Sequence, residues 1–145
     1  MGLLVRLHYW IAQQLNYLQP LALLGARFYV AWVFFASGLT KIRDWDSTLL
    51  LFQYEYQVPV LSPELAAYLG TAGELVLPVF LVLGLFGRFA GIGMSILNVM
   101  AVVSLEEIAP AAFNLHLIWG GLAAMIVFWG AGKLSLDTLL ERKYG

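Results

Sequence analysis

Two charged side chains lie inside long apolar stretches, and they are the first candidates for chemistry in this sequence. Arg27 interrupts the apolar stretch 21–40, and Glu74 interrupts the stretch 65–87. Each stretch is long enough to cross a membrane, which takes about 20 residues, and a charge at the bilayer centre costs about 2.5–3.5 kcal/mol on insertion scales. Each side chain therefore needs a partner, a wet cavity or, for Glu74, a proton. We expect Arg27 and Glu74 to lie on one seam between two neighbouring helices.

The predicted pair of Arg27 and Glu74 has three open interpretations. The two side chains could simply hold their helices together. They could instead form a polar pocket that binds a ligand or takes part in a proton step. In the third interpretation, Arg27 extends toward the membrane surface and Glu74 stays protonated.

Pro78 adds to the case for a pocket beside Glu74. Proline has no backbone N–H, so the carbonyl of Glu74, four residues earlier, loses its helical donor. We therefore predict a kink at Pro78. Non-helical backbone at membrane depth is tolerated where it is buried in protein or lines a cavity, so the kink fits either a binding pocket or close packing.

Three further polar residues could belong to the same intramembrane pocket. Lys41 shares a helical face with Arg27. His116 lies near the start of the fourth apolar stretch, where it could reach Lys41 or Glu106, or serve as an interfacial anchor. Asn98 lies at mid-depth in the third stretch and could form an interhelical hydrogen bond or contact a ligand. The pocket candidates are Arg27, Lys41, Glu74, Asn98 and His116, with Pro78 as the kink.

Several kinds of chemistry are excluded. The chain has no cysteine and only two histidines, His8 and His116, which are too far apart for metal-ligand spacing. No nucleophile and base stand in a recognisable arrangement, and Gly91-Ile-Gly93 lacks the third glycine of a dinucleotide fingerprint. The net charge is −1 without a basic stripe, which excludes a nucleic-acid partner. We expect no metal and no intrinsic cofactor, and whether the protein is an enzyme stays open.

The composition places these residues in an integral membrane protein. Of 145 residues, 61% are hydrophobic and 12% are charged, whereas roughly 25% are charged in a soluble domain. The mean hydropathy is +0.82. Since lipid offers backbone groups no hydrogen-bond partner, the spans must be helices. We predict an all-α membrane protein, a four-helix transmembrane bundle with spans at residues 21–40, 65–87, 89–105 and 111–131.

The N-terminal segment has a different pattern from the spans. Residues 3–18 place leucines and an isoleucine on one helical stripe, with polar residues between them. This pattern predicts an amphipathic helix at the inner surface of the membrane. We therefore divide the chain into an N-terminal amphipathic helix, residues 1–20, and a four-helix transmembrane domain, residues 21–145.

Two further segments outside the spans predict short helices. Residues 44–57 begin with aspartates and continue with aromatic anchors, which indicates a short helix on the outer face. Residues 134–143 predict a second amphipathic segment. Ser62, Pro63 and Glu64 are typical of a helix start and mark the beginning of the second span.

The positive charges predict the orientation in the membrane. One side of a four-span bundle holds both termini, and here that side carries five lysine and arginine side chains while the other carries two. We therefore expect a multi-pass protein of the bacterial inner membrane with both termini in the cytoplasm. The five are Arg6, Arg88, Lys133, Arg142 and Lys143, and the two are Lys41 and Arg43.

Several short motifs occur in a recognisable order. They are Arg27 and then Gly38-Leu-Thr-Lys41, Gly73-Glu74, Gly84-Leu-Phe-Gly87-Arg88, His116 and Gly132-Lys-Leu-Ser135-Leu-Asp137. This arrangement resembles the DoxX family of small four-span bacterial inner-membrane proteins. The resemblance covers roughly residues 21–140 and implies a four-helix bundle with both termini inside. The family takes its name from an association with thiosulfate:quinone oxidoreductase, and some members are linked to redox or sulfur stress.

Three functions remain open at this point. The chain could be a membrane subunit of, or partner to, a quinone-linked oxidoreductase system, with quinone bound non-covalently and electrons supplied by a redox partner protein. It could instead transport or bind another small lipophilic molecule through the same polar core. It could also be a non-catalytic assembly subunit whose charges serve packing. The expected partners are the lipid bilayer, a redox partner protein and further copies of this chain.

Overall fold

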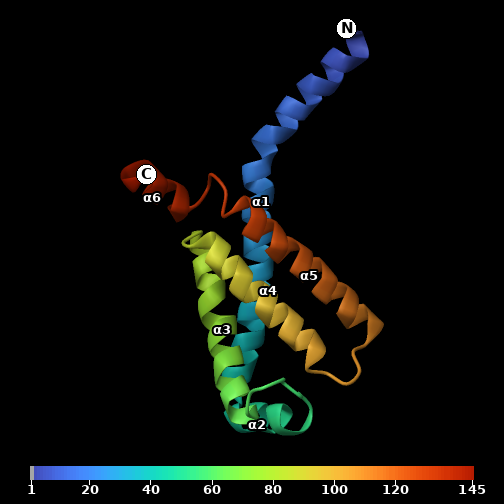
Figure 1. Ribbon diagram of the computed structural model, residues 1–145, viewed down its shortest axis with the longest axis vertical. Coiled ribbons are helices and arrows are strands. Elements are labelled where there is room, and N and C mark those ends of the chain that lie inside the picture. Colours follow the sequence, from blue (N-terminus) through green and yellow to red (C-terminus); the bar gives the residue numbers. More distant parts are fainter. Residues whose placement is uncertain (1) are drawn as a thin grey trace.

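The computed structural model describes residues 2–145, and within this range it is all-helical (Figure 1). This confirms the predicted fold class. The helices are α1 (Leu3–Arg43), α2 (Trp45–Tyr54), α3 (Pro63–Leu83), α4 (Gly87–Val103), α5 (Pro110–Trp129) and α6 (Leu136–Tyr144).

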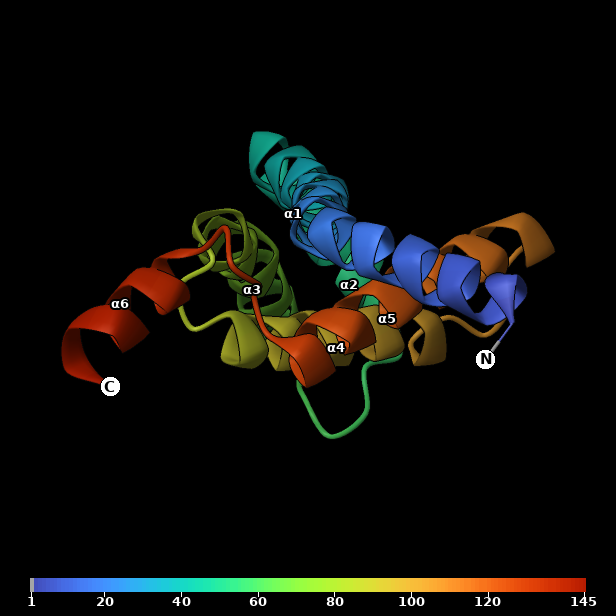
Figure 2. The same ribbon diagram turned by 90° about the horizontal axis from the view of Figure 1, so that it is seen from above.

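Four of these helices form the bundle. α1 packs against α3, α3 against α4, and α4 against α5 (Figures 1 and 2). Apolar side chains from all four helices, large ones and alanines, fill the core between them. The core residues are Val30, Ala31, Phe34, Leu81, Ala90, Met94, Ala123 and Ile126.

The bundle has two ends that carry different elements (Figure 1). We name them the α2 end, which also holds the α4–α5 connection, and the α6 end, which also holds the α3–α4 turn. The candidate site residues divide between these two ends, so the distinction matters for function.

Three helices, α1, α3 and α5, are long and apolar enough to cross a membrane. α4 is apolar but has 17 residues, which is about 26 Å of helix against a hydrocarbon core of about 30 Å. The protein is therefore a helical membrane protein, as its composition predicts.

Local sequence signals explain where the helices begin. Ser62 caps α3, because its hydroxyl accepts a hydrogen bond from the backbone N–H of Leu65 at 3.4 Å. Asp44 caps α2 in the same way, with its carboxylate accepting from the Ser47 N–H at 3.0 Å and from the Ser47 hydroxyl at 2.6 Å. The predicted helix starts at Ser62 and at the aspartates of 44–57 are thus explained by direct bonds.

The N-terminal segment is continuous with the first span. α1 runs from Leu3 to Arg43 as one helix of 41 residues, with Pro20 inside it. Its first part projects beyond the other helices and is inclined to the rest of α1 (Figures 1 and 2). The domain boundary predicted at residue 20 therefore coincides with the proline within one helix.

Candidate functional site

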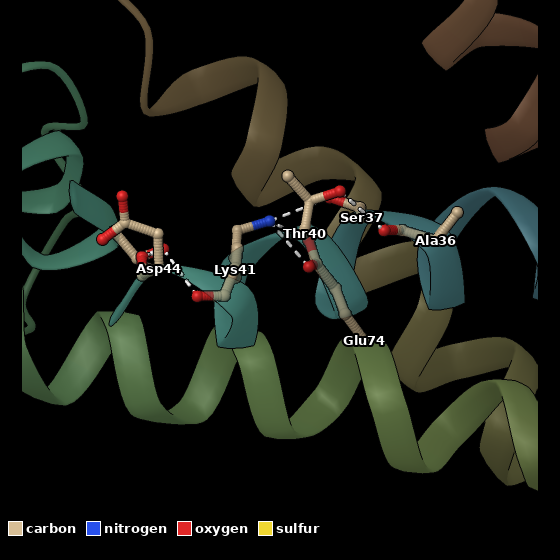
Figure 3. A network of polar contacts seen from close by, with 7 residues as sticks. Ala36, Ser37, Thr40, Lys41, Asp44 and Glu74 are labelled. Atoms are coloured by element: carbon tan, nitrogen blue, oxygen red, sulfur yellow. Dashed lines mark hydrogen bonds and ion pairs between the residues drawn. The ribbon is translucent and has the colours of Figure 1, made fainter. Parts of the chain in front are cut away.

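Glu74 is paired with Lys41, and the predicted pairing of Glu74 with Arg27 is wrong. The Lys41 Nζ lies 2.6 Å from Glu74 Oε2 and 2.9 Å from Oε1 (Figure 3). The two side chains are only 15% and 13% exposed. α1 and α3 are neighbours, as predicted, but their ion pair lies toward the α2 end.

Close packing of α1 on α3 makes this ion pair reachable. A Cβ built at Gly38 would lie 2.9 Å from the Leu75 side chain and 3.1 Å from Glu74 Cβ, so only glycine fits there without a shift. The ammonium of Lys41 also donates to the Ser37 hydroxyl at 2.9 Å. Its three N–H groups therefore have three acceptors, two on Glu74 and one on Ser37.

Thr71 lies one turn before Glu74 and adds an unused polar group. Its side chain is 4% exposed, and its hydroxyl has no hydrogen-bond partner among the described residues. A buried hydroxyl without a partner costs free energy comparable to a lost hydrogen bond. Together, Ser37, Lys41, Thr71 and Glu74 form what we call the α2-end cluster.

α2 covers this cluster from the outside. The Thr48 hydroxyl donates to the Lys41 carbonyl at 2.9 Å, which ties α2 to the end of α1. Phe52 lies 3.5 Å from a Cβ built at Gly70, and its ring meets that of Tyr56 edge to face at 5.0 Å. Burial raises the pKa of Tyr56, and the negative charges of Glu74 and Glu55 raise it further.

Arg27 belongs to the α6 end and binds backbone carbonyls there. Its side chain is 1% exposed. Nε donates to Leu81 O at 2.7 Å and Nη2 to Val82 O at 2.8 Å, which closes the last turn of α3. Nη1 donates to Ala131 O at 2.8 Å and to Leu134 O at 2.7 Å, which holds the α5–α6 connection. Arg27 therefore joins three segments of the fold and has no contact with Glu74.

Asp137 completes the closure of the α6 end. Its carboxylate accepts from the backbone N–H of Phe86 and of Gly87, each at 2.7 Å, and so caps α4. The Asp137 N–H donates to Gly84 O at 2.9 Å. Gly84 has a φ of +64°, and a Cβ there would lie 2.5 Å from Arg27 Nη2. The glycine-rich motif at 84–88 and the motif at 132–137 thus meet at Arg27.

Asn98 and His116 form a separate pair of polar contacts between α4 and α5. The Asn98 amide donates to His116 O at 2.9 Å, and Asn98 Oδ1 lies 2.9 Å from His116 Nδ1. Gly120 provides the space, because a Cβ there would lie 2.9 Å from Asn98 Nδ2. His116 has no hydrogen bond to Lys41 or Glu106 within residues 2–145. Of the two roles that the sequence left open for Asn98, the structure shows the interhelical hydrogen bond.

Pro78 is fully buried inside α3, which stays helical through it. It lines an apolar groove of about 380 Å³ between α1 and α3. A second apolar groove, of about 390 Å³, lies between α4 and α5. None of the five polar candidates lines either groove. The residues of the α1–α3 groove are Phe28, Ala31, Trp32, Phe35, Pro78, Val79, Val82 and Leu83.

The sequence reading missed Ser37, Thr71 and Tyr56 at the α2 end. Helical spacing was the available signal for the first two, because Ser37 lies four residues before Lys41 and Thr71 lies three before Glu74. No local signal in the sequence indicates the packing of Tyr56 on Phe52. Within residues 2–145, no three His, Asp or Glu side chains gather closely enough to hold a metal ion.

Comparisons with known proteins identify the family. The family described as DoxX matches residues 22–107, which is more than half of the chain and includes Arg27, Lys41, Glu74 and Asn98. A relative described as an uncharacterized protein, from Haemophilus influenzae (strain ATCC 51907 / DSM 11121 / KW20 / Rd), is 29% identical over 130 residues, which is 85% of each chain. No solved structure matches this chain. The chain belongs to the DoxX family of membrane proteins.

Proposed function

We propose that this protein is a membrane subunit of, or partner to, a quinone-linked oxidoreductase system, and that the α2-end cluster binds the polar head of the quinone. The single observation that carries the proposal is the buried hydroxyl of Thr71, which has no hydrogen-bond partner among the described residues and lies three positions before Glu74 on α3. Such a group fits a ligand oxygen, because a hydroxyl can donate to a carbonyl or accept from a phenol.

The energetics of the ion pair support a ligand role over simple packing. Taking Lys41 and Glu74 out of water carries a desolvation cost that their attraction often only balances, and apolar side chains of similar volume frequently give equal or greater stability. A pair kept only to join α1 and α3 would therefore gain little. A ligand that interacts with both charges would explain why a charged pair stands at this position.

The shape of the surroundings suits a quinone. Quinone sites combine an apolar slot with a few polar groups for the carbonyl oxygens. The α1–α3 groove is lined by Phe28, Trp32 and Phe35 and lies on the same two helices, closer to the α6 end. An isoprenoid tail in this groove would place its head toward Thr71 and Glu74.

The electrons would come from a redox partner protein, because the proposed site on this chain holds a quinone and no second redox centre to reduce it. Positive charges gather at the α6 end, which supports a cytoplasmic α6 end in the bacterial inner membrane. The α2-end cluster would then lie in the periplasmic half of the bilayer.

The experiment measures quinone that copurifies with the protein in native lipids. We expect quinone in the unmodified protein and several-fold less in Thr71→Val, which removes the hydroxyl while keeping the side chain's shape. Thr40→Val is the matched control, because Thr40 is exposed and its hydroxyl bonds to Ala36 O within α1. Equal quinone content in all three proteins would overturn the assignment of the site.

Other outcomes of the same purification would point to the alternative functions. A different lipophilic molecule in the unmodified protein, reduced in Thr71→Val, would favour a transport or binding protein for that molecule. No bound molecule in any preparation would favour a non-catalytic assembly subunit, whose charges serve packing.

A further inference from the structure

The N-terminal part of α1 is longer than the membrane needs. The whole helix has 41 residues, which is about 61 Å at 1.5 Å per residue. The part from residue 21 to Arg43 is about 34 Å long and already covers a hydrocarbon core of about 30 Å. Residues 3–19 therefore extend beyond the span at the α6 end, as Figure 1 shows.

This extension is not covered by the rest of the protein. Every side chain from Leu3 to Gln19 is exposed except that of Ala12, which is half-buried. Large apolar side chains nevertheless recur at helical spacing on one face, at positions 4, 7, 11, 15 and 18. The opposite face carries Arg6, Gln13 and Asn16. Exposing an apolar stripe of this length to water is unfavourable, and such a surface marks a site that contacts a protein or a membrane.

We propose that residues 3–19 lie in the headgroup–acyl boundary of the bilayer that α1 spans, with the apolar stripe toward the acyl chains. The continuity of α1 carries this choice of partner, because the extension leaves the spanning segment at the surface of that same bilayer. An amphipathic helix with polar residues on one face is the form that binds such a surface. The proposal does not depend on quinone binding.

Two exposed aromatic residues between the apolar stripe and the polar face support a lipid surface. Trp10 is 60% exposed and Tyr17 is 77% exposed. Both side chains combine an apolar ring with a polar N–H or O–H, and such residues concentrate at membrane interfaces. Around the helix they lie between Leu7 of the stripe and Arg6 of the polar face, with Tyr17 nearer to Arg6.

Pro20 provides the bend that the proposal requires. Because proline has no N–H, the carbonyl of Asn16 has no helical donor, and the ring disfavours a straight helix. The extension already departs from the direction of the spanning part (Figures 1 and 2). Rotation at Pro20 would bring residues 3–19 down onto the membrane surface.

α6 repeats the same arrangement at the same end. Its apolar side chains Leu136, Leu139 and Leu140 are exposed, and its last turn carries Arg142 and Lys143. Lysine and arginine favour the anionic headgroups of a phospholipid surface. Two uncovered amphipathic helices at one end indicate a surface that both of them share.

The test uses single cysteines in the full-length protein, which has no native cysteine. Spin labels are attached at Ile11→Cys, on the apolar stripe, and at Gln13→Cys, the matched control on the polar face. The protein is reconstituted into phosphatidylethanolamine–phosphatidylglycerol vesicles. Collision rates with oxygen, which dissolves in lipid, and with a water-soluble nickel chelate are measured for each label.

We expect the oxygen-to-nickel ratio at position 11 to exceed that at position 13 several-fold. Similar ratios at both positions, with nickel favoured, would show that the helix extends into water and would overturn the proposal. Dipolar broadening at position 11 that grows with the protein-to-lipid ratio would also overturn it, because the stripe would then face a second copy of the chain. The two substitutions should leave the fold intact, since both side chains are exposed.

Discussion

The carboxylate of Asp137 caps the N-terminus of α4 by accepting from the Gly87 N–H at 2.7 Å, across 50 residues of sequence. Arg27 performs the complementary task at the end of α3, where its guanidinium donates to the last carbonyls. At the turn between α3 and α4, the positive Arg27 thus lies at the C-terminal end of α3 and the negative Asp137 at the N-terminal end of α4. The helix dipole favours both placements. The short motifs at 84–88 and 132–137, far apart in the sequence, meet in this closure of the α6 end.

Arg27→Leu should lower the free energy of unfolding by more than about 2 kcal/mol. The substitution removes four hydrogen bonds to backbone carbonyls that are buried or partly buried, and leucine offers the carbonyls no donor. Thermal unfolding in detergent measures the loss. Arg88→Leu is the matched control, because Arg88 is exposed although it also donates to two carbonyls, and we expect less than about 1 kcal/mol there. Equal losses would contradict a special role for Arg27.

Gly84→Ala should destabilise the protein clearly. The φ of +64° disfavours any side chain, and a Cβ would lie 2.5 Å from both Arg27 Nη2 and Ser135 Cβ. Gly25→Ala and Gly121→Ala are the controls, because both glycines are helical and a Cβ there meets nothing within 4 Å. The controls should keep or raise the melting temperature, since alanine favours a helix by about 1 kcal/mol over glycine. A stable Gly84→Ala protein would contradict the close approach of Arg27.

The ion pair can be tested for function separately from stability. Glu74→Gln leaves the ammonium of Lys41 without its counter-charge, and breaking a buried pair costs about 3–5 kcal/mol at most. Adding Lys41→Gln should recover most of that loss, because an amide pair can bond without charge. If the pair serves the ligand, the double variant should be stable and yet hold several-fold less quinone. A stable double variant with normal quinone content would assign the pair to packing alone.

The orientation predicts which positions react with a thiol reagent that cannot cross the membrane. A cysteine at Gln53, which is exposed on α2, should be labelled from outside intact cells. A cysteine at Glu141, which is exposed on α6, should be labelled only after the cells are opened. The reverse pattern would place the α6 end outside, against the excess of positive charge at that end.

The cap of α2 predicts a dependence of stability on pH. Hydrogen bonds from the Ser47 hydroxyl and N–H lower the pKa of Asp44 below its usual value of 3.8. A lowered pKa in the folded state contributes stability that is present above 3.8 and is lost as the pH falls through the lower, folded-state value. Asp44→Asn should remove this part of the acid sensitivity. Melting temperatures of the two proteins on a falling pH series measure it, and parallel curves would contradict the cap.

Much of the fold follows from the sequence alone because its causes are local. Apolar stretches of span length force helices in lipid, since each backbone group must then bond within its own segment. Ser62 and Asp44 start α3 and α2 through bonds to residues only three positions away. The amphipathic pattern at residues 3–18 likewise depends on one helix and was visible without any packing.

The partners of the charged residues were decided by tertiary structure. Depth along the spans suggested that Arg27 would reach Glu74, but depth does not define which carbonyls or glycines a neighbouring helix presents. Gly38 brings α1 close to α3, and Lys41 thereby reaches Glu74. The carbonyls of Leu81 and Val82 face a neighbouring side chain only because α3 ends and the chain turns at Gly84, and they accept from Arg27. Hydrogen bonds across 33 and 54 residues depend on how helices pack, which no local pattern contains.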